Sequence, residues 1–113
     1  MIVQELVTTL GFRVSVPGNM EREVSGGYAS DLLSCVMAGA RAGYVWVTLQ
    51  AHPNVVAVAS LLDLAAVIVS EGVAPDEETL ERARENGVTL LQASQTTFTT
   101  VGRLCALGIR GEE

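Results

Sequence analysis

Hydrophobic positions at the start of the chain follow a helical spacing and then alternate with polar ones. Between residues 2 and 10 the apolar side chains recur three or four positions apart, and Gly11 follows them. This pattern predicts a short amphipathic helix that ends at the glycine. Residues 12–16 alternate between apolar and polar side chains and stop at Pro17-Gly18, which indicates a strand and a turn.

Residues 24–34 read VSGGYASDLLS, in which a glycine pair is followed by small polar residues and an apolar run. Ser30 is of a residue type preferred at helix N-caps, and Asp31 would be favourable in the first turn. The sequence therefore predicts a helix that starts at Ser30 and continues through residue 37. Residues 23–29 would form a strand that feeds this helix.

From residue 44 onward, β-prone runs recur at regular intervals, and each is followed by a loop and a helix signal. These runs are residues 44–49, 65–69 and 88–91. Strand–helix repetition of this kind favours a parallel sheet joined by right-handed crossovers. Since 113 residues are the size of one domain, the expected fold is α/β, a single domain over residues 1–113 with a mainly parallel sheet.

The helix signals in this second half differ in strength. Pro53 suits the first position of a helix, although the valine-rich residues 55–62 that follow favour a strand equally. Residues 75–78, a proline and three acids, open another helix that Asn86-Gly87 closes. Residues 94–97 open the last one.

Charge and composition remove several classes of function. The formal net charge is −6, all seven basic residues are arginines, and they form no cluster. Nucleic acid and anionic membrane surfaces are therefore not expected as partners. The absence of lysine excludes a Walker phosphate loop, a Schiff-base lysine and the Lys–Glu pair of a protein kinase.

No membrane segment or leader is expected either. No apolar stretch is long enough to span a bilayer, and the first residues lack the basic region of a signal peptide. The protein is therefore expected in the cytoplasm. Cys35 and Cys105 lie within apolar surroundings, which favours buried, reduced thiols.

Polar loops that follow the expected strands are the place for a ligand, because ligands of open parallel sheets bind beyond the carboxyl ends of the strands. The loops are residues 50–54, 70–75 and 92–97, with residues 25–28 as a further wall. The candidate ligand-binding residues are Ser25, Gly26, Gly27, Tyr28, Ser30, Asp31, Gln50, His52, Asn54, Ser70 and Gly72. The glycine pair has two interpretations: backbone amides that hold an anion, or a close approach of two backbones.

His52 is the only histidine, so no Cys/His metal cluster can form, and neither a metal nor a cofactor is expected. No catalytic residue is assigned. The alternative is a small enzyme in which His52 works with nearby Ser or Asp residues, for example Ser94.

Residues 65–104, AAVIVSEGVAPDEETLERARENGVTLLQASQTTFTTVGRL, carry a resemblance to a known family. A strand that ends in a glycine turn, a proline, an acidic helix, a Gly-Val strand and a Thr-rich helix start resemble the end of the N-terminal domain of HPr kinase/phosphorylase. The same arrangement is typical of DRTGG domains, and the first half of the chain looks like a stand-alone branch of that family. The resemblance implies a small three-layer domain with a regulatory role, and homodimers, since such domains often pair.

Two departures qualify the resemblance. The family's Thr-Gly-Gly turn corresponds here to Ser70-Glu71-Gly72, and its Asp-Arg pair has no match in the loop Gln50–Asn54. Proteins of this branch are often labelled serine kinases, but HPr kinase performs its chemistry in a separate P-loop domain. We therefore expect a non-catalytic sensor that binds a nucleotide or other small metabolite and serves a partner enzyme or signalling protein. Its dimer interface is expected on the helix around residues 32–37 and the strand Tyr44–Trp46.

Overall fold

Helices and strands alternate along the computed structural model, which describes residues 1–111. The elements are α1 (Val3–Leu10), β1 (Arg13–Val16), β2 (Gly26–Ala29), α2 (Leu33–Gly39), β3 (Tyr44–Thr48), α3 (Pro53–Leu61), β4 (Ala66–Val69), α4 (Glu77–Asn86), β5 (Leu90–Gln92) and α5 (Thr97–Ala106). The valine-rich segment after Pro53 is therefore a helix. Pro53 occupies its first turn, as the sequence suggests.

Within the described residues the strands form one five-stranded sheet in the order β1-β5-β4-β3-β2. The strands β2, β3, β4 and β5 run parallel to one another, which confirms the expected mainly parallel sheet. Only β1 is antiparallel, and its pairing with β5 shifts register between Val14 and Val16. Because β2, β3, β4 and β5 run in the same direction, their carboxyl ends lie at the same end of the sheet.

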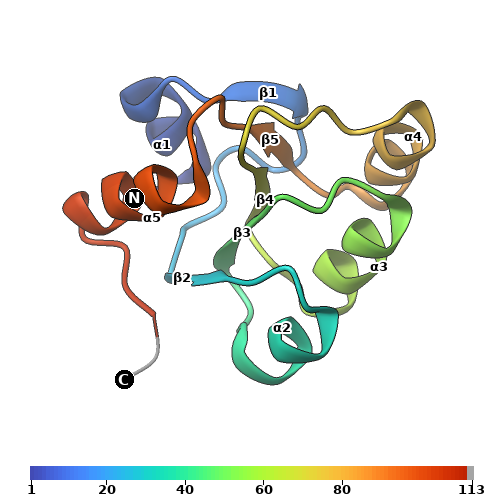
Figure 1. The fold of residues 1–113 in the computed structure, drawn as a ribbon, viewed down its shortest axis with the longest axis horizontal. Helices are drawn as coiled ribbons and strands as arrows, with labels where there is room; N and C mark the ends of the chain where they lie inside the picture. Colours follow the sequence, from blue (N-terminus) through green and yellow to red (C-terminus); the bar gives the residue numbers. More distant parts are fainter. Residues whose placement is uncertain (112–113) are drawn as a thin grey trace.

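Helices cover both faces of the sheet, which gives the three-layer arrangement (Figure 1). Alternate residues of β3 point to opposite faces. Val45 and Val47 pack with residues of α1 and α5, whereas Trp46 packs with α2, α3 and α4. No helix in the described part of the chain is both long and apolar enough to cross a membrane.

The helix that was expected to start at Ser30 begins instead at Leu33, and its N-cap residue is Leu32. Two contacts with β3 explain the difference. The Asp31 carboxylate accepts hydrogen bonds from the hydroxyl of Thr48 at 2.8 Å and from the backbone amide of Leu49 at 2.9 Å. Ser30 and Asp31 therefore continue along the neighbouring strand and cannot enter a helix.

The expectation of buried thiols is wrong for both cysteines, which are exposed. Cys35 precedes the fully buried Val36 on α2, and Cys105 follows the buried Leu104 on α5. Because successive helix residues point about 100° apart, an apolar neighbour in sequence does not place a side chain in the core.

Candidate functional site

The carboxyl ends of β2 and β3 are joined by a network around Asp31. Besides its bonds to Thr48 and Leu49, Asp31 accepts a hydrogen bond at its backbone oxygen from Nε2 of Gln50 at 3.2 Å. The indole Nε1 of Trp46 donates to the backbone oxygen of Ser30 at 2.8 Å. The loop after β3 and the end of the segment 26–31 therefore contact one another through Gln50.

His52 and Asn54 lie further along the chain, at the start of α3. Both side chains are exposed, and His52 is the N-cap residue of α3. The pKa of Asp76 is lowered mainly by hydrogen bonds from the side chain and backbone of Thr79, with a smaller effect of the charge of His52. Both residues therefore lie at the exposed start of α3.

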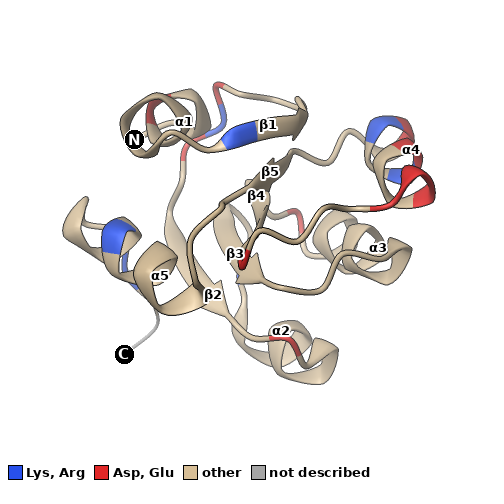
Figure 2. Ribbon diagram, turned by 45° about the horizontal axis from the view of Figure 1, so that its top comes forward, with Lys and Arg blue, Asp and Glu red and all other residues tan. Residues whose placement is uncertain are grey.

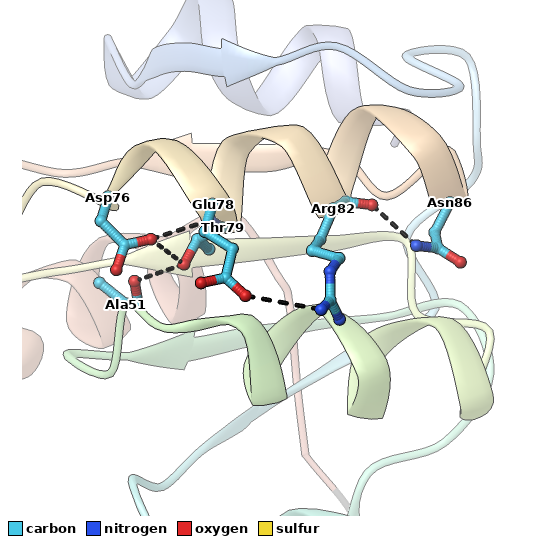
Figure 3. Close-up of polar contacts among 6 residues, drawn as sticks. All are labelled: Ala51, Asp76, Glu78, Thr79, Arg82 and Asn86. Atoms are coloured by element: carbon cyan, nitrogen blue, oxygen red, sulfur yellow. Dashed lines mark hydrogen bonds and ion pairs between the residues drawn. The ribbon is translucent and has the colours of Figure 1, made fainter.

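The Asp76 carboxylate caps α4, and the Thr79 hydroxyl connects this helix to the loop before α3 (Figure 3). Its Oδ1 accepts from the backbone nitrogen of Thr79 at 2.8 Å and lies 2.7 Å from the Thr79 hydroxyl. That hydroxyl also lies 2.9 Å from the backbone oxygen of Ala51. This arrangement holds two helices in place, which is a structural role.

The turn after β4 is held by hydrogen bonds to Ala93, just after β5, and to the first residue of α5. Ser70 is fully buried, and its hydroxyl lies 2.7 Å from that of Thr97. The Glu71 carboxylate accepts from the backbone nitrogen of Thr97 at 2.6 Å, at the start of α5. The amide of Gly72 donates to the backbone oxygen of Ala93 at 3.1 Å. The polar groups that the sequence suggested for a ligand here are engaged within the fold.

The glycine pair lies within the edge strand β2, not in a loop before a helix. A Cβ atom on Gly26 would lie 2.5 Å from Cε1 of Tyr44 and 2.8 Å from the backbone oxygen of Arg110. The amide of Gly27 donates to that same oxygen at 3.0 Å. Of the two interpretations, the geometry favours the close approach of two backbones. Ser25, just before the pair, donates from its hydroxyl to the backbone oxygen of Ala42.

A cavity of about 420 Å³ lies along the outer edge of β2. Gly27 and Tyr28 of the candidate set line it, together with Val101, Leu104 and Cys105 of α5. Two arginines from distant segments, Arg41 after α2 and Arg110 after α5, are also among the lining residues. No sequence pattern indicates this cavity, since its walls come from parts of the chain that only the fold brings together.

A family model describes the DRTGG domain, and it matches residues 16–107. The chain belongs to the DRTGG family. Among solved structures, this DRTGG domain is similar to the CBS and DRTGG domains of the regulatory region of Clostridium perfringens pyrophosphatase, complexed with its activator, diadenosine tetraphosphate. The TM-score is 0.74 at 20% sequence identity, a likeness of fold. The match covers 96% of this chain and 47% of the other, so the chain spans about half the length of that protein. No match was found among proteins of curated function.

Two successive residues in the turn after β4 have a left-handed backbone conformation. Glu71 has a φ of 63° and Gly72 a φ of 69°, so both adopt the left-handed conformation that glycine favours. In this DRTGG domain a glutamate occupies the first of the two positions, where its carboxylate binds the first turn of α5. Ligand binding by the candidate residues at the strand ends stays a prediction.

Proposed function

We propose that this DRTGG domain is a non-catalytic regulatory module of the cytoplasm that binds a nucleotide or another small metabolite and signals its presence to a partner enzyme or signalling protein. The observation that carries the proposal is the cavity beside β2. Its volume of about 420 Å³ lies within the range of small-molecule sites, and its lining is mostly apolar with a few polar groups. The solved relative supports the proposal, because its DRTGG domain belongs to a regulatory region.

The arrangement of polar side chains favours a binding module over an enzyme. Catalysis by nucleophile and base needs two side chains within hydrogen-bond reach whose groups are available to a substrate. The hydroxyls of Ser70 and Thr97 bind one another, and the carboxylates of Asp31 and Asp76 hold neighbouring backbone. His52 is the exposed N-cap residue of α3, and the Asp76 carboxylate caps α4.

A ligand screen by thermal shift tests the binding function, because a compound that binds only the folded state raises its melting temperature. We expect at least one phosphorylated or uncharged metabolite to do so. Failure of a broad panel would contradict the proposal. In parallel, the protein should not transfer phosphate from ATP to a serine substrate. Stoichiometric transfer that is abolished in His52→Ala would support the alternative of an enzyme.

We further propose that the domain forms a homodimer through α2, where Leu32 and Met37 are 61% and 44% exposed. The strand Tyr44–Trp46, which the sequence suggested as part of the interface, cannot take part. It belongs to β3, a strand in the interior of the sheet, and Tyr44 and Trp46 are buried. A symmetric pair of α2 helices would cover the exposed apolar side chains.

Light scattering across a dilution series tests the dimer. We expect twice the mass of 11.9 kDa for the native protein and the monomer mass for the double variant Leu32→Glu/Met37→Glu. The matched control is Phe98→Glu, which places a charge at an exposed apolar side chain of α5 on the opposite face. A native protein that stays at the monomer mass at micromolar concentration would overturn the dimer and leave the binding function open.

A further inference from the structure

The strand β2 forms one edge of the sheet and presents backbone groups along it. The amide of Ser30 donates inward, to the backbone oxygen of Val47 on β3. The amide of Gly27 donates outward, to the backbone oxygen of Arg110. Because the direction of the backbone groups alternates along a strand of a parallel sheet, the amide and carbonyl groups of Ala29 face outward too. No hydrogen bond with another residue that the structure describes engages these two groups.

The cavity beside β2 reaches this free edge from both faces of the sheet. Val101, Leu104 and Cys105 of α5 line it on one face, and Gly39 of α2 lines it on the other. Ala29 lies between these two walls and lines the cavity itself. The strand β2 passes between α5 and α2 (Figure 1), so the cavity extends the plane of the sheet beyond its last strand. A flat molecule in this plane would meet the backbone of β2 with its edge and the two helices with its faces.

Small residues keep the edge of β2 accessible. Gly27 and Ala29 share the face that α5 covers, and neither has a side chain beyond Cβ. A Cβ atom on Gly27 would lie 3.2 Å from Cγ2 of Ile109, so a larger residue would narrow the cavity. On the other face, a Cβ atom on Gly39 would overlap with the ring of Tyr28, which therefore packs closely against α2. The ring forms a wall of the cavity, and Ala29 stays exposed.

Charge favours an uncharged ligand at this edge. The net charge of the chain is −6, which repels anions. The strand β2 carries no charged residue, in contrast to α4, which carries acids and arginines (Figure 2). Arg41 and Arg110 also line the cavity, but Arg41 is already engaged in an interaction of its own. An uncharged ring would gain contact with the apolar walls and with the backbone of Ala29 without competing for Arg41.

We propose that the cavity beside β2 binds an uncharged planar heterocycle of the nucleobase type, with one edge against Ala29. A ring acceptor would take the hydrogen of the Ala29 amide, and a neighbouring ring donor would bind the carbonyl oxygen of the same residue. These are the bonds that a residue of an added strand would form with an edge. The proposal rests on the proposed function and names its ligand class. Specificity would come from the pair, since a ring that lacks either group leaves a backbone group unpaired inside the cavity.

The size of the cavity and the length of the free edge both fit a single ring system. A volume of about 420 Å³ lies near the lower end of the range for small-molecule sites, roughly 300–1,000 Å³. An extended peptide would need several consecutive free residues along the edge. Arg110 already occupies the amide of Gly27, so within the described residues the unpaired outward amide of β2 is that of Ala29. A ring meets this limit, and a peptide strand does not.

Titration of the whole protein with adenosine, guanosine, cytidine and uridine tests the ligand class, with the melting temperature as the readout. Each nucleoside has a counterpart methylated at its donor, such as adenosine with a dimethylated amino group. We expect at least one of the four to raise the melting temperature. Its methylated counterpart should bind about threefold to tenfold more weakly, the usual effect of one lost hydrogen bond.

Two substitutions test the site itself. Ala29→Pro removes the amide that the ring acceptor needs, and an edge strand tolerates proline where the amide faces outward. The affinity should fall about threefold or more, whereas the control Ala29→Ser keeps the amide and should bind within about twofold of the native protein. If Ala29→Pro does not fold, Cys105→Phe gives the same test, because it fills the cavity from α5. Its matched control is Ala106→Phe, at the next residue of the helix, which is exposed outside the cavity.

Thiol labelling locates the site. Cys105 lines the cavity, whereas Cys35 is exposed on α2 outside it, so the same protein carries a reporter and an internal control. At saturating nucleoside, the rate of modification by a disulfide reagent should fall several-fold at Cys105 and stay unchanged at Cys35. The two rates can be read separately by mass spectrometry of the labelled peptides.

The outcomes separate this proposal from the broader function. If a nucleoside raises the melting temperature but neither protects Cys105 nor is weakened by Ala29→Pro or Cys105→Phe, the cavity is not its site, although the binding function stands. If the methylated counterparts bind equally well, the role of the Ala29 backbone is overturned. If no nucleoside binds while another metabolite of the broad panel does, the ligand class is wrong. If nothing in either panel binds, the proposed function fails as well.

Discussion

Replacing Gly26 by alanine tests whether glycine is required at this position because its neighbours leave no room for a side chain. Gly26 does not have a positive φ, so the backbone at this position suits alanine and the penalty comes from space alone. The added Cβ atom would lie 2.5 Å from Cε1 of Tyr44 and 2.8 Å from the backbone oxygen of Arg110. Tyr44 is only 8% exposed, so its ring has little room to move away.

The magnitude follows from two opposing effects. Overpacking a dense region costs about 1–3 kcal/mol of folding free energy. Alanine regains about 0.5–1 kcal/mol, because glycine loses more conformational freedom than alanine when it enters a strand. The overlap is the larger effect, so Gly26→Ala should destabilise the domain by about 1–2 kcal/mol. For a domain slightly above 100 residues this corresponds to a fall in Tm of about 4–8 °C.

Urea denaturation followed by the fluorescence of Trp46, the single tryptophan, measures the change. The matched control is Gly102→Ala in α5, where an added Cβ atom meets nothing within 4 Å. There only the helix propensity acts, so stability should rise by up to about 1 kcal/mol. In a Tyr44→Leu background, which removes the ring, the cost of Gly26→Ala should become smaller.

An unchanged or higher stability of Gly26→Ala would refute this reasoning. The pair would then not be required by the approach of Tyr44 and the C-terminal segment. Anion binding by its amides would become the better explanation of the two glycines. A loss of equal size in the Tyr44→Leu background would show that the ring is not the cause.

Three further substitutions test other parts of the fold. Trp46→Phe removes the hydrogen bond to the backbone oxygen of Ser30 and leaves a gap in the core, so the free energy of unfolding should fall by about 2–3 kcal/mol in calorimetry. Leu6→Ala, at a fully buried position of α1, should cost about 2–5 kcal/mol in urea denaturation, and a cost below 1 kcal/mol would contradict the packing of α1. The pKa of Asp76 is lowered below 3.8 in the folded state by Thr79, so its charge stabilises the fold above about pH 4 and this contribution is lost as the pH falls through the lowered pKa. Asp76→Asn keeps a capping oxygen but not the charge, so the fall of Tm in acid should become shallower, and an unchanged profile would refute the assignment.

Local signals in the sequence were sufficient to predict the α/β class and the ends of several elements. Gly11 and Gly87 end α1 and α4 in the left-handed conformation, with φ values of 73° and 65°. The capping acids before α4 were readable for the same reason, because a helix end depends on residues that are close in sequence. Repetition of strands and helices was enough to favour a parallel sheet.

Positions that depend on partners distant in sequence were not predictable. The start of α2 moved to Leu33 because Asp31 binds Thr48 and Leu49 of the neighbouring strand. The valine-rich segment after Pro53 had strand propensity but became a helix, with Val55, Val56 and Ala59 packed against the sheet. Tertiary packing outweighs a propensity of a few tenths of a kcal/mol per residue.

The sequence by itself determined what this DRTGG domain cannot be: with no lysine and one histidine, it lacks the residues of a P-loop kinase or a Cys/His metal site. Only the tertiary structure decided which of the candidate groups are engaged within the fold and where a cavity lies. The candidate groups at the strand ends are largely engaged with one another, whereas the cavity beside β2 is lined by segments that lie far apart in the sequence. The physical reason is that residue types limit the available chemistry, but a site is made by distances between residues that only the folded chain brings together.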